Sequence, residues 1–161
     1  MFGFKKQKKV IEILAPFDGE TSDIATVNDP VFSQLMLGDG CAIIPSSGDV
    51  YAPVTGKIVV VAETAHSVCL KTSQGMELMI HYGIDTVKHG GNGFTMKVEN
   101  DQEVQAGELL FHCDQEYFTT QGVDMTSPIL IINGDSFEIK EKYLQKKVRA
   151  GDVILKVAPK S

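Results

Sequence analysis

Two histidines, His66 and His81, have the type and the surroundings that could do chemistry in this 161-residue chain. An imidazole has an ordinary pKa of about 6.5, so near neutral pH its uncharged form is a good nucleophile toward phosphorus. A second imidazole beside it can donate to phosphoryl oxygens as negative charge builds on them. Two neighbouring imidazoles can also form part of a zinc site, and two histidines can meet by chance. The residue types alone leave these three interpretations open.

The segment between the two histidines predicts the β-hairpin that would bring them together. Residues 68–80 contain two short apolar runs separated by a turn signal, Thr-Ser-Gln-Gly. A hairpin that folds symmetrically about this turn places His66 opposite His81 and Val68 opposite Met79. Directly opposed side chains share one face of a sheet, with Cβ atoms about 5 Å apart. A slip of one residue would send the histidines to opposite faces, so their pairing depends on the turn.

Two neighbours could orient the rings. Thr64 lies two residues before His66, and Gly83 lies two residues after His81, so each shares a side with its histidine in a regular strand. The Thr64 hydroxyl could fix the tautomer of His66, and the Gly83 carbonyl could accept from one nitrogen of His81. The other nitrogen of His81 would then be the nucleophile. The chain has no Walker loop, Gly-x-Gly-x-x-Gly motif or magnesium-binding carboxylate cluster, so a phosphoryl donor would be something other than bound ATP.

Length and composition predict one cytoplasmic domain at residues 10–161, preceded by a basic, flexible N-terminal tail at residues 1–9. There is no apolar run of membrane-spanning length and no secretory signal. Three cysteines without a Cys-x-x-Cys motif suit a reducing compartment, and a formal charge of −6 argues against nucleic acid as a partner. The tail carries four lysines and two phenylalanines. A weak contact with an anionic membrane surface is its functional alternative.

Internal repeats and turn signals predict an all-β fold. Residues 13–20 and 50–57 share an Ala-Pro-x-x-Gly motif. Residues 104–111 and 148–155 share a Val-x-Ala-Gly motif, followed in both by an acidic residue and an apolar strand. Short strands at 41–44, 57–62 and 129–132 favour an antiparallel sandwich or barrel. Only short helical turns are expected, at 29–35 and 114–122, the first with a proline suited to a first helical position.

The remaining candidates have simpler explanations. His89 and His112 are expected to be surface or edge residues. Lys57 follows Ala-Pro-Val-Thr-Gly, which is similar to the surroundings of a biotinyl or lipoyl carrier lysine, but it is more simply a solvent-exposed strand residue. Asp29 and Asp85 could be turn formers, or they could form an acidic rim that receives a basic partner.

At the level of whole motifs, the chain resembles the glucose-family enzyme IIA component of the bacterial sugar phosphotransferase system. The match extends from about residue 10 to the C-terminus, and its most specific part is the sequence His-Tyr-Gly-Ile-Asp-Thr-Val with a second histidine at the proper distance before it. The matching segments are residues 13–16 with Gly19, 31–32, 37–40, 52–54 with Gly56, 63–66, 81–87 and 91–94.

The resemblance implies an antiparallel β-sandwich of duplicated hybrid motifs that acts as a phosphotransferase component. His81 would accept a phosphoryl group from phospho-HPr and pass it to a cysteine in the IIB domain of a sugar permease. His66 would support the phosphoryl group, with Thr64 and Gly83 orienting the two rings. No cofactor is required for this function.

The resemblance also implies how partners dock. Asp29 and Asp85 match acidic positions that meet arginines of HPr. Phe32, Val68 and Met79 would form an apolar collar that receives flat partner surfaces and keeps water from the phosphohistidine.

Three alternatives accompany this interpretation. The unphosphorylated face could be a regulatory module that docks permeases or kinases. A zinc peptidase similar to lysostaphin would need a His-x-His pair, which the chain lacks, although His66 and His81 could bind zinc if a partner's carboxylate completed the site. A biotinyl or lipoyl carrier would depend on Lys57 alone.

Overall fold

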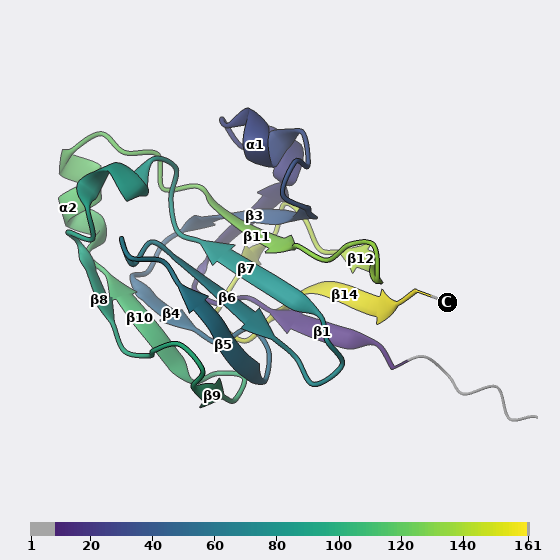
Figure 1. Ribbon diagram of the computed structural model, residues 1–161. Helices are drawn as coiled ribbons and strands as arrows, with labels where there is room; N and C mark the ends of the chain where they lie inside the picture. The colour runs from purple at the N-terminus through teal and green to yellow at the C-terminus, as the bar shows by residue number, and fades with distance from the viewer. Residues whose placement is uncertain (1–8, 161) are drawn as a thin grey trace, which may run out of the picture.

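The computed structural model describes residues 9–160, so the predicted tail, apart from Lys9, lies outside the described residues (Figure 1). In chain order the elements are β1 (Ile11–Leu14), β2 (Gly19–Asp23), η1 (Ile24–Thr26), α1 (Pro30–Ser33), β3 (Asp39–Pro45), β4 (Asp49–Tyr51), β5 (Gly56–Val61), β6 (Ser67–Lys71), β7 (Glu77–His81), η2 (Thr86–His89), β8 (Phe94–Met96), β9 (Glu103–Val104), β10 (Leu109–Cys113), α2 (Gln115–Thr120), β11 (Ser127–Ile131), β12 (Phe137–Lys142), β13 (Lys147–Val148) and β14 (Val153–Pro159). Across residues 9–160 the helical elements are too short to cross a membrane.

These strands form three antiparallel sheets around one main core. The largest sheet has the order β13-β2-β3-β11-β7-β6-β5-β9, and the two smaller sheets are β1-β14-β12 and β4-β10-β8. Ile13, Ile80 and Leu110 come from the three different sheets, and each is fully buried in the same core. The inner face of the large sheet therefore packs on both smaller sheets, which confirms the predicted β-sandwich with few helical turns (Figure 1).

The two repeats seen in the sequence pair with each other. Ala15 exchanges two backbone hydrogen bonds, of 2.7 and 2.9 Å, with residues 151–152. Ala52 exchanges two such bonds, of 2.8 Å each, with residues 107–108. Each Ala-Pro motif thus meets one Ala-Gly turn in the same way, because both halves place an extended segment beside a tight glycine turn. This arrangement is the duplication that the sequence predicts.

Both predicted helical turns form and begin with aspartate caps. The Asp29 side chain accepts from the Val31 N–H at 3.0 Å, and Pro30 lies in the first turn of α1, where a missing N–H costs nothing. Asp114 accepts from the Tyr117 N–H in the same manner at the start of α2. The first of these turns lies over the outer face of the large sheet, above β3 and β11 (Figure 1).

The turn between β6 and β7 has a different geometry from the symmetric one predicted. The Thr72 N–H donates to the Met76 carbonyl at 2.9 Å, and the Met76 N–H donates to Thr72 Oγ1 at 3.2 Å. Residues 73–75 therefore form the loop, and Gly75 at its end has a φ of +92°. Glycine adopts this left-handed conformation without the steric cost of a Cβ. An odd number of loop residues moves the strand pairing by one position.

The predicted register is consequently wrong by one residue. Cys69, rather than Val68, lies opposite Met79. Val68 lies opposite Ile80, and both side chains are fully buried in the main core. The prediction that Val68 belongs to an apolar collar on the surface is therefore wrong, because its side chain points to the other face of the sheet.

A smaller apolar cluster covers part of the outer face of the large sheet. Its buried members come from η1, α1 and strands β3 and β11, together with the loop after β7, and Met79 and Ile132 pack against it. The cluster consists of Ile24, Val27, Phe32, Ala42, Ile84 and Leu130. It fixes the α1 segment above the end of β7, where His81 is the last strand residue.

Candidate functional site

The structure brings His66 and His81 together although they are not opposite each other in the ladder. Ser67 lies opposite His81, and the His66 carbonyl accepts from the Tyr82 N–H at 2.8 Å. Ala65 has a φ of +57° and turns the chain just before β6, so the His66 ring leaves the regular alternation. The two ring centroids lie 4.7 Å apart with an interplanar angle of 75°. The turn at Ala65, just before β6, therefore brings the His66 ring into contact with the His81 ring.

The Gly83 carbonyl decides which nitrogen of His81 carries the proton. His81 Nδ1 lies 2.8 Å from the Gly83 oxygen. Because a carbonyl oxygen can only accept, the proton belongs on Nδ1, and the lone pair belongs on Nε2. Nε2 has no hydrogen-bond partner among residues 9–160, and no buried side-chain nitrogen or oxygen there is unsatisfied, so Nε2 reaches the solvent. The site therefore presents a neutral imidazole with an open nucleophilic nitrogen.

The Gly83 peptide is itself held in place by residues that sequence reasoning missed. Its N–H donates to Ser127 Oγ at 2.9 Å, and Ser127 donates to the Met125 carbonyl at 2.8 Å. Thr86 Oγ1 donates to the Tyr82 carbonyl at 2.7 Å from the other side. Ser127 and Thr86 are both fully buried, and losing one such partner leaves a buried group unsatisfied at a cost of about 1–3 kcal/mol. Ser127 lies far from His81 in the sequence, and Thr86 falls within the His-Tyr-Gly-Ile-Asp-Thr-Val motif, but the motif did not predict that its hydroxyl holds the Tyr82 carbonyl.

Thr64 contacts the second ring in the way that the sequence suggested. Thr64 Oγ1 and His66 Nδ1 form a short hydrogen bond. If the hydroxyl donates, the ring proton lies on His66 Nε2, which has no protein partner within the described chain. The glycine-rich loop after η2 lies beside Thr64, because a Cβ on Gly91 would come within 3.8 Å of the Thr64 oxygen. Thr64 and the loop therefore support the same end of the hairpin.

Both rings are uncharged at neutral pH. Burial, and to a smaller extent the neighbouring His81, lower the pKa of His66 to about 4. Burial also lowers the pKa of His81, although the hydrogen bond to Gly83 and the charges of Asp29 and Asp85 oppose this effect. A neutral His81 keeps its lone pair, and a neutral His66 keeps one N–H to donate. The two rings therefore have complementary roles across the physiological pH range.

The low pKa of His66 predicts how stability depends on pH. The pKa of His66 is about 6.5 in the unfolded chain and about 4 in the folded protein. In that interval the unfolded state binds more protons, so the free energy of unfolding falls as the pH is lowered from 7 to 4. Urea unfolding at pH 7 and pH 4.5 should show a smaller loss in His66→Gln than in the wild type. Equal losses in the two proteins would contradict the assigned shift.

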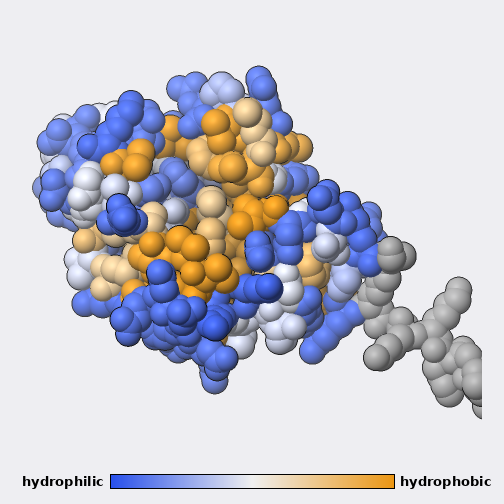
Figure 2. Space-filling model, viewed as in Figure 1, coloured by the Kyte–Doolittle hydropathy of each residue, from blue (hydrophilic) through white to orange (hydrophobic). Residues whose placement is uncertain are grey.

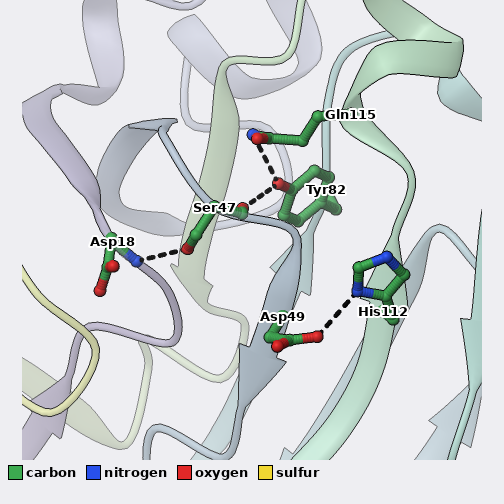
Figure 3. Close-up of polar contacts among 6 residues, drawn as sticks. All are labelled: Asp18, Ser47, Asp49, Tyr82, His112 and Gln115. Atoms are coloured by element: carbon green, nitrogen blue, oxygen red, sulfur yellow. Dashed lines mark hydrogen bonds and ion pairs between the residues drawn. The ribbon is translucent and has the colours of Figure 1, made fainter.

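Tyr82 anchors the end of β7 from the core side (Figure 3). Its ring is fully buried, its hydroxyl donates to the Ser47 carbonyl at 2.7 Å, and Gln115 Nε2 donates to the same hydroxyl at 3.2 Å. Burial raises the pKa of this phenol well above its usual range. Figure 3 also shows the contact between His112 and Asp49. Their Nδ1 and Oδ1 atoms lie 2.7 Å apart, and the pair, on β10 and β4, belongs to a different sheet from β7, which carries His81.

Acidic and apolar residues surround His81. The charges of Asp29 and Asp85 both raise its pKa, so both lie near the ring, while Asp29 also caps α1 and Asp85 lies 3.7 Å from Lys88. The two interpretations of these aspartates, turn former and acidic rim, are therefore compatible. The Phe32 ring centroid lies 4.9 Å from that of His81, and Phe32 is only 4% exposed.

Several exposed apolar side chains belong to segments that adjoin this site, namely α1 with the residues after it, η2 and β5, and we call them the apolar rim. Figure 2 shows orange surface gathered over α1 and again across the middle of the molecule, where β5 to β7 lie. The rim consists of Val31, Leu35, Met36, Leu37, Val60 and Val87. Met36 is 68% exposed, which is unusual for a methionine without a partner surface. The predicted collar missed these residues, although the apolar run at 35–37 beside a helical turn was a visible signal.

The other candidates lie apart from the histidine pair. No group of three or more His, Cys, Asp or Glu side chains within residues 9–160 is placed to hold a metal ion. His89 Nδ1 contacts the Tyr117 hydroxyl at 3.1 Å, beside α2. Lys57 is half exposed on β5, 3.7 Å from Asp101. The structure therefore brings together His66, His81 and their local partners, and it leaves His89, His112 and Lys57 elsewhere.

Comparisons with known proteins agree with this geometry. Residues 11–137 match the family described as phosphoenolpyruvate-dependent sugar phosphotransferase system, EIIA 1. The chain is 41% identical over 139 residues to the glucose-specific EIIA components of two Staphylococcus epidermidis strains, which covers 86% of this chain and 84% of each relative. The solved structure of glucose permease IIA from Mycoplasma capricolum superposes with a TM-score of 0.88 at 38% identity, over 97% of this chain and 99% of that one. The chain therefore belongs to the EIIA 1 family of the sugar phosphotransferase system and acts as a phosphocarrier in sugar uptake.

Proposed function

We propose that His81 Nε2 is the atom that carries the phosphoryl group, received from phospho-HPr. The observation that supports this proposal is the bond from His81 Nδ1 to the Gly83 carbonyl, which leaves the lone pair on the open nitrogen. In the first step a phosphorus–nitrogen bond forms at Nε2 as the bond from phosphorus to its donor atom in HPr breaks. In the second step a cysteine thiolate in the IIB domain of a permease attacks phosphorus, and Nε2 leaves with its lone pair.

His66 stabilises the phosphoryl group in this proposal. Its ring lies edge-on to that of His81, with centroids 4.7 Å apart, and Thr64 occupies its other nitrogen. A hydroxyl that donates to Nδ1 leaves a proton on Nε2, which can donate to a phosphoryl oxygen as charge develops. The low pKa keeps this donor neutral, so it retains one N–H without adding a charge that would have to be desolvated.

The surface around His81 suits brief docking of basic proteins. Asp29 and Asp85 lie near the ring and can pair with arginines of HPr, and the apolar rim can bury against a flat partner. A formal charge of −6 favours encounter with a basic partner. The same exposed apolar surface would also serve regulatory docking of permeases or kinases to the unphosphorylated protein. We assign these roles to a cytoplasmic domain at residues 10–161.

Zinc binding is a second candidate function of the histidine pair. His81 Nε2 has a free lone pair, and His66 Nε2 would have one in the tautomer whose Nδ1–H donates to Thr64; imidazole nitrogen is a normal zinc ligand. The described residues place no third His, Cys, Asp or Glu side chain with this pair. A carboxylate from a partner would therefore have to complete a tetrahedral site.

Intact mass measurement tests the proposed function directly. After incubation with phosphoenolpyruvate, enzyme I and HPr, the wild-type chain should gain about 80 Da, and brief acid treatment should remove the gain. Addition of a IIB domain from a glucose-type permease should remove it without acid, since the relatives at 41% identity are glucose-specific components. A chain whose mass does not change in the presence of active enzyme I and HPr would overturn the proposal.

A further inference from the structure

Ser67 is the residue that the shifted register places directly opposite His81. The neighbouring pair, His66 with Tyr82, is joined by a backbone hydrogen bond of 2.8 Å. Hydrogen-bonded and non-hydrogen-bonded pairs alternate along an antiparallel ladder, so Ser67 and His81 form a non-hydrogen-bonded pair. Side chains approach each other most closely in such pairs, with Cβ atoms about 4.5–5.5 Å apart. The Ser67 side chain therefore lies on the same face as the His81 ring and beside it.

The Ser67 hydroxyl is also available to donate a hydrogen bond. Ser67 is half-buried, and its hydroxyl has no hydrogen-bond partner within residues 9–160. No buried side-chain oxygen in that part of the chain is unsatisfied, so Ser67 Oγ must be open to solvent. In contrast, Ser127 and Thr86, which hold the Gly83 peptide, are buried and already donate to backbone carbonyls, and the Thr64 hydroxyl is engaged with His66. Ser67 is thus a hydroxyl beside the site whose donor is not engaged.

The ring of His81 lies on the side where this hydroxyl can reach it. His81 contacts the His66 ring, which belongs to the residue just before Ser67, at a centroid distance of 4.7 Å. Phe32 also contacts the His81 ring, at a centroid distance of 4.9 Å, so the surroundings of this ring include an apolar phenyl group as well as the start of β6. Phosphoryl oxygens need hydrogen-bond donors, and a phenyl ring supplies none.

We propose that Ser67 is a further catalytic residue that donates its hydroxyl proton to a phosphoryl oxygen carried on His81 Nε2. The proposal builds on the assignment of His81 as the phosphoryl carrier. Ser67 and His66 would then act as two donors from adjacent positions at the start of β6. The hydroxyl adds no charge, so it stabilises the phosphorylated form without affecting the neutral state of either ring.

The test is the equilibrium of phosphoryl exchange between phospho-HPr and this protein, measured by intact mass. Ser67→Ala should shift the exchange constant toward phospho-HPr by about tenfold, the size expected for one hydrogen bond to a charged group. Ser67→Thr, which keeps the hydroxyl and suits a strand, should restore it. Ser73→Ala is the matched control, because Ser73 is exposed in the loop at the far end of the same hairpin and contacts only Gln74.

A purely structural role would not reproduce this pattern. The phosphorus NMR signal of the phosphohistidine should move in Ser67→Ala and stay unchanged in Ser73→Ala, while urea midpoints of both variants match the wild type. An exchange constant and a phosphorus signal in Ser67→Ala equal to those of the wild type would overturn the role of Ser67 and leave His81 as the carrier. Acid-stable phosphate on Ser67 would also overturn it, because the hydroxyl would then be an acceptor. A wild-type chain that takes no phosphoryl group would instead refute the assignment of His81.

Discussion

The His81→Gln variant is expected to take up no phosphoryl group. Glutamine is close in size to histidine, but its amide nitrogen has no lone pair free for attack on phosphorus. The Gly83 carbonyl can still accept from the glutamine amide, so the hairpin end should remain folded. Incubation with phosphoenolpyruvate, enzyme I and HPr should therefore leave the intact mass unchanged, whereas the wild type gains about 80 Da.

His112→Gln is the matched control for this experiment. His112 is about half exposed, pairs with Asp49 and belongs to a different sheet, so its replacement should leave uptake at the wild-type level. The urea midpoint of His81→Gln, measured in parallel, separates lost chemistry from lost fold. An acid-labile gain of about 80 Da in a folded His81→Gln protein would show that another residue carries the phosphoryl group. It would refute the assignment of His81 as the carrier.

The His66→Gln variant is expected to accept the phosphoryl group and to fail in passing it on. His81 and its bond to Gly83 are untouched by the change, so the nucleophile remains. What is lost is the Nε2–H of His66, which the hydrogen bond from Thr64 to Nδ1 keeps protonated in a ring that lies edge-on to His81. Removal of one well-placed donor to a charged transition state typically lowers a rate by about 100- to 1000-fold. The transfer rate to a IIB domain should fall by that order while the extent of phosphorylation remains measurable.

The comparison needs two measurements on the same phosphorylated samples. Phosphoprotein is first prepared with excess phospho-HPr, and the loss of about 80 Da is then followed after addition of the IIB domain. His89→Gln serves as the control, because His89 lies beside Tyr117, and its ring contacts are with residues 117 and 118 of α2. Transfer from His66→Gln at the wild-type rate would remove His66 from the mechanism. Complete failure of uptake would mean that His66 acts in the first step as well.

The register correction changes which residues belong to the site. With the predicted symmetric turn, Val68 would have lined the surface beside His81. The three-residue loop ending at Gly75 instead buries Val68 and brings Ser67 opposite His81. A single loop residue therefore decides whether Val68 or Ser67 lies on the face of the sheet that presents His81. This is why the proposed role of Ser67 could not be reached from the sequence pattern.

The sequence by itself determined the features that depend on near neighbours in the chain. Strand and turn patterns, the aspartate caps of the two helical turns and the repeated Ala-Pro motifs are all local, and the structure contains them. The contacts of Thr64 with His66 and of Gly83 with His81 span two residues each, so nearness in the chain was enough to suggest them, although Thr64 and Gly83 lie outside strands β6 and β7.

Only the tertiary structure decided the features that depend on distant segments. The support of Gly83 by Ser127 spans 44 residues, and the wall formed by Phe32 requires α1 to pack over the large sheet. The lowered pKa of both histidines arises from burial, which no short pattern reports. Near-neighbour contacts follow from backbone geometry, whereas register, burial and long-range contacts follow from how the whole core packs. For that reason the sequence could name the pair of histidines but could not say what surrounds them.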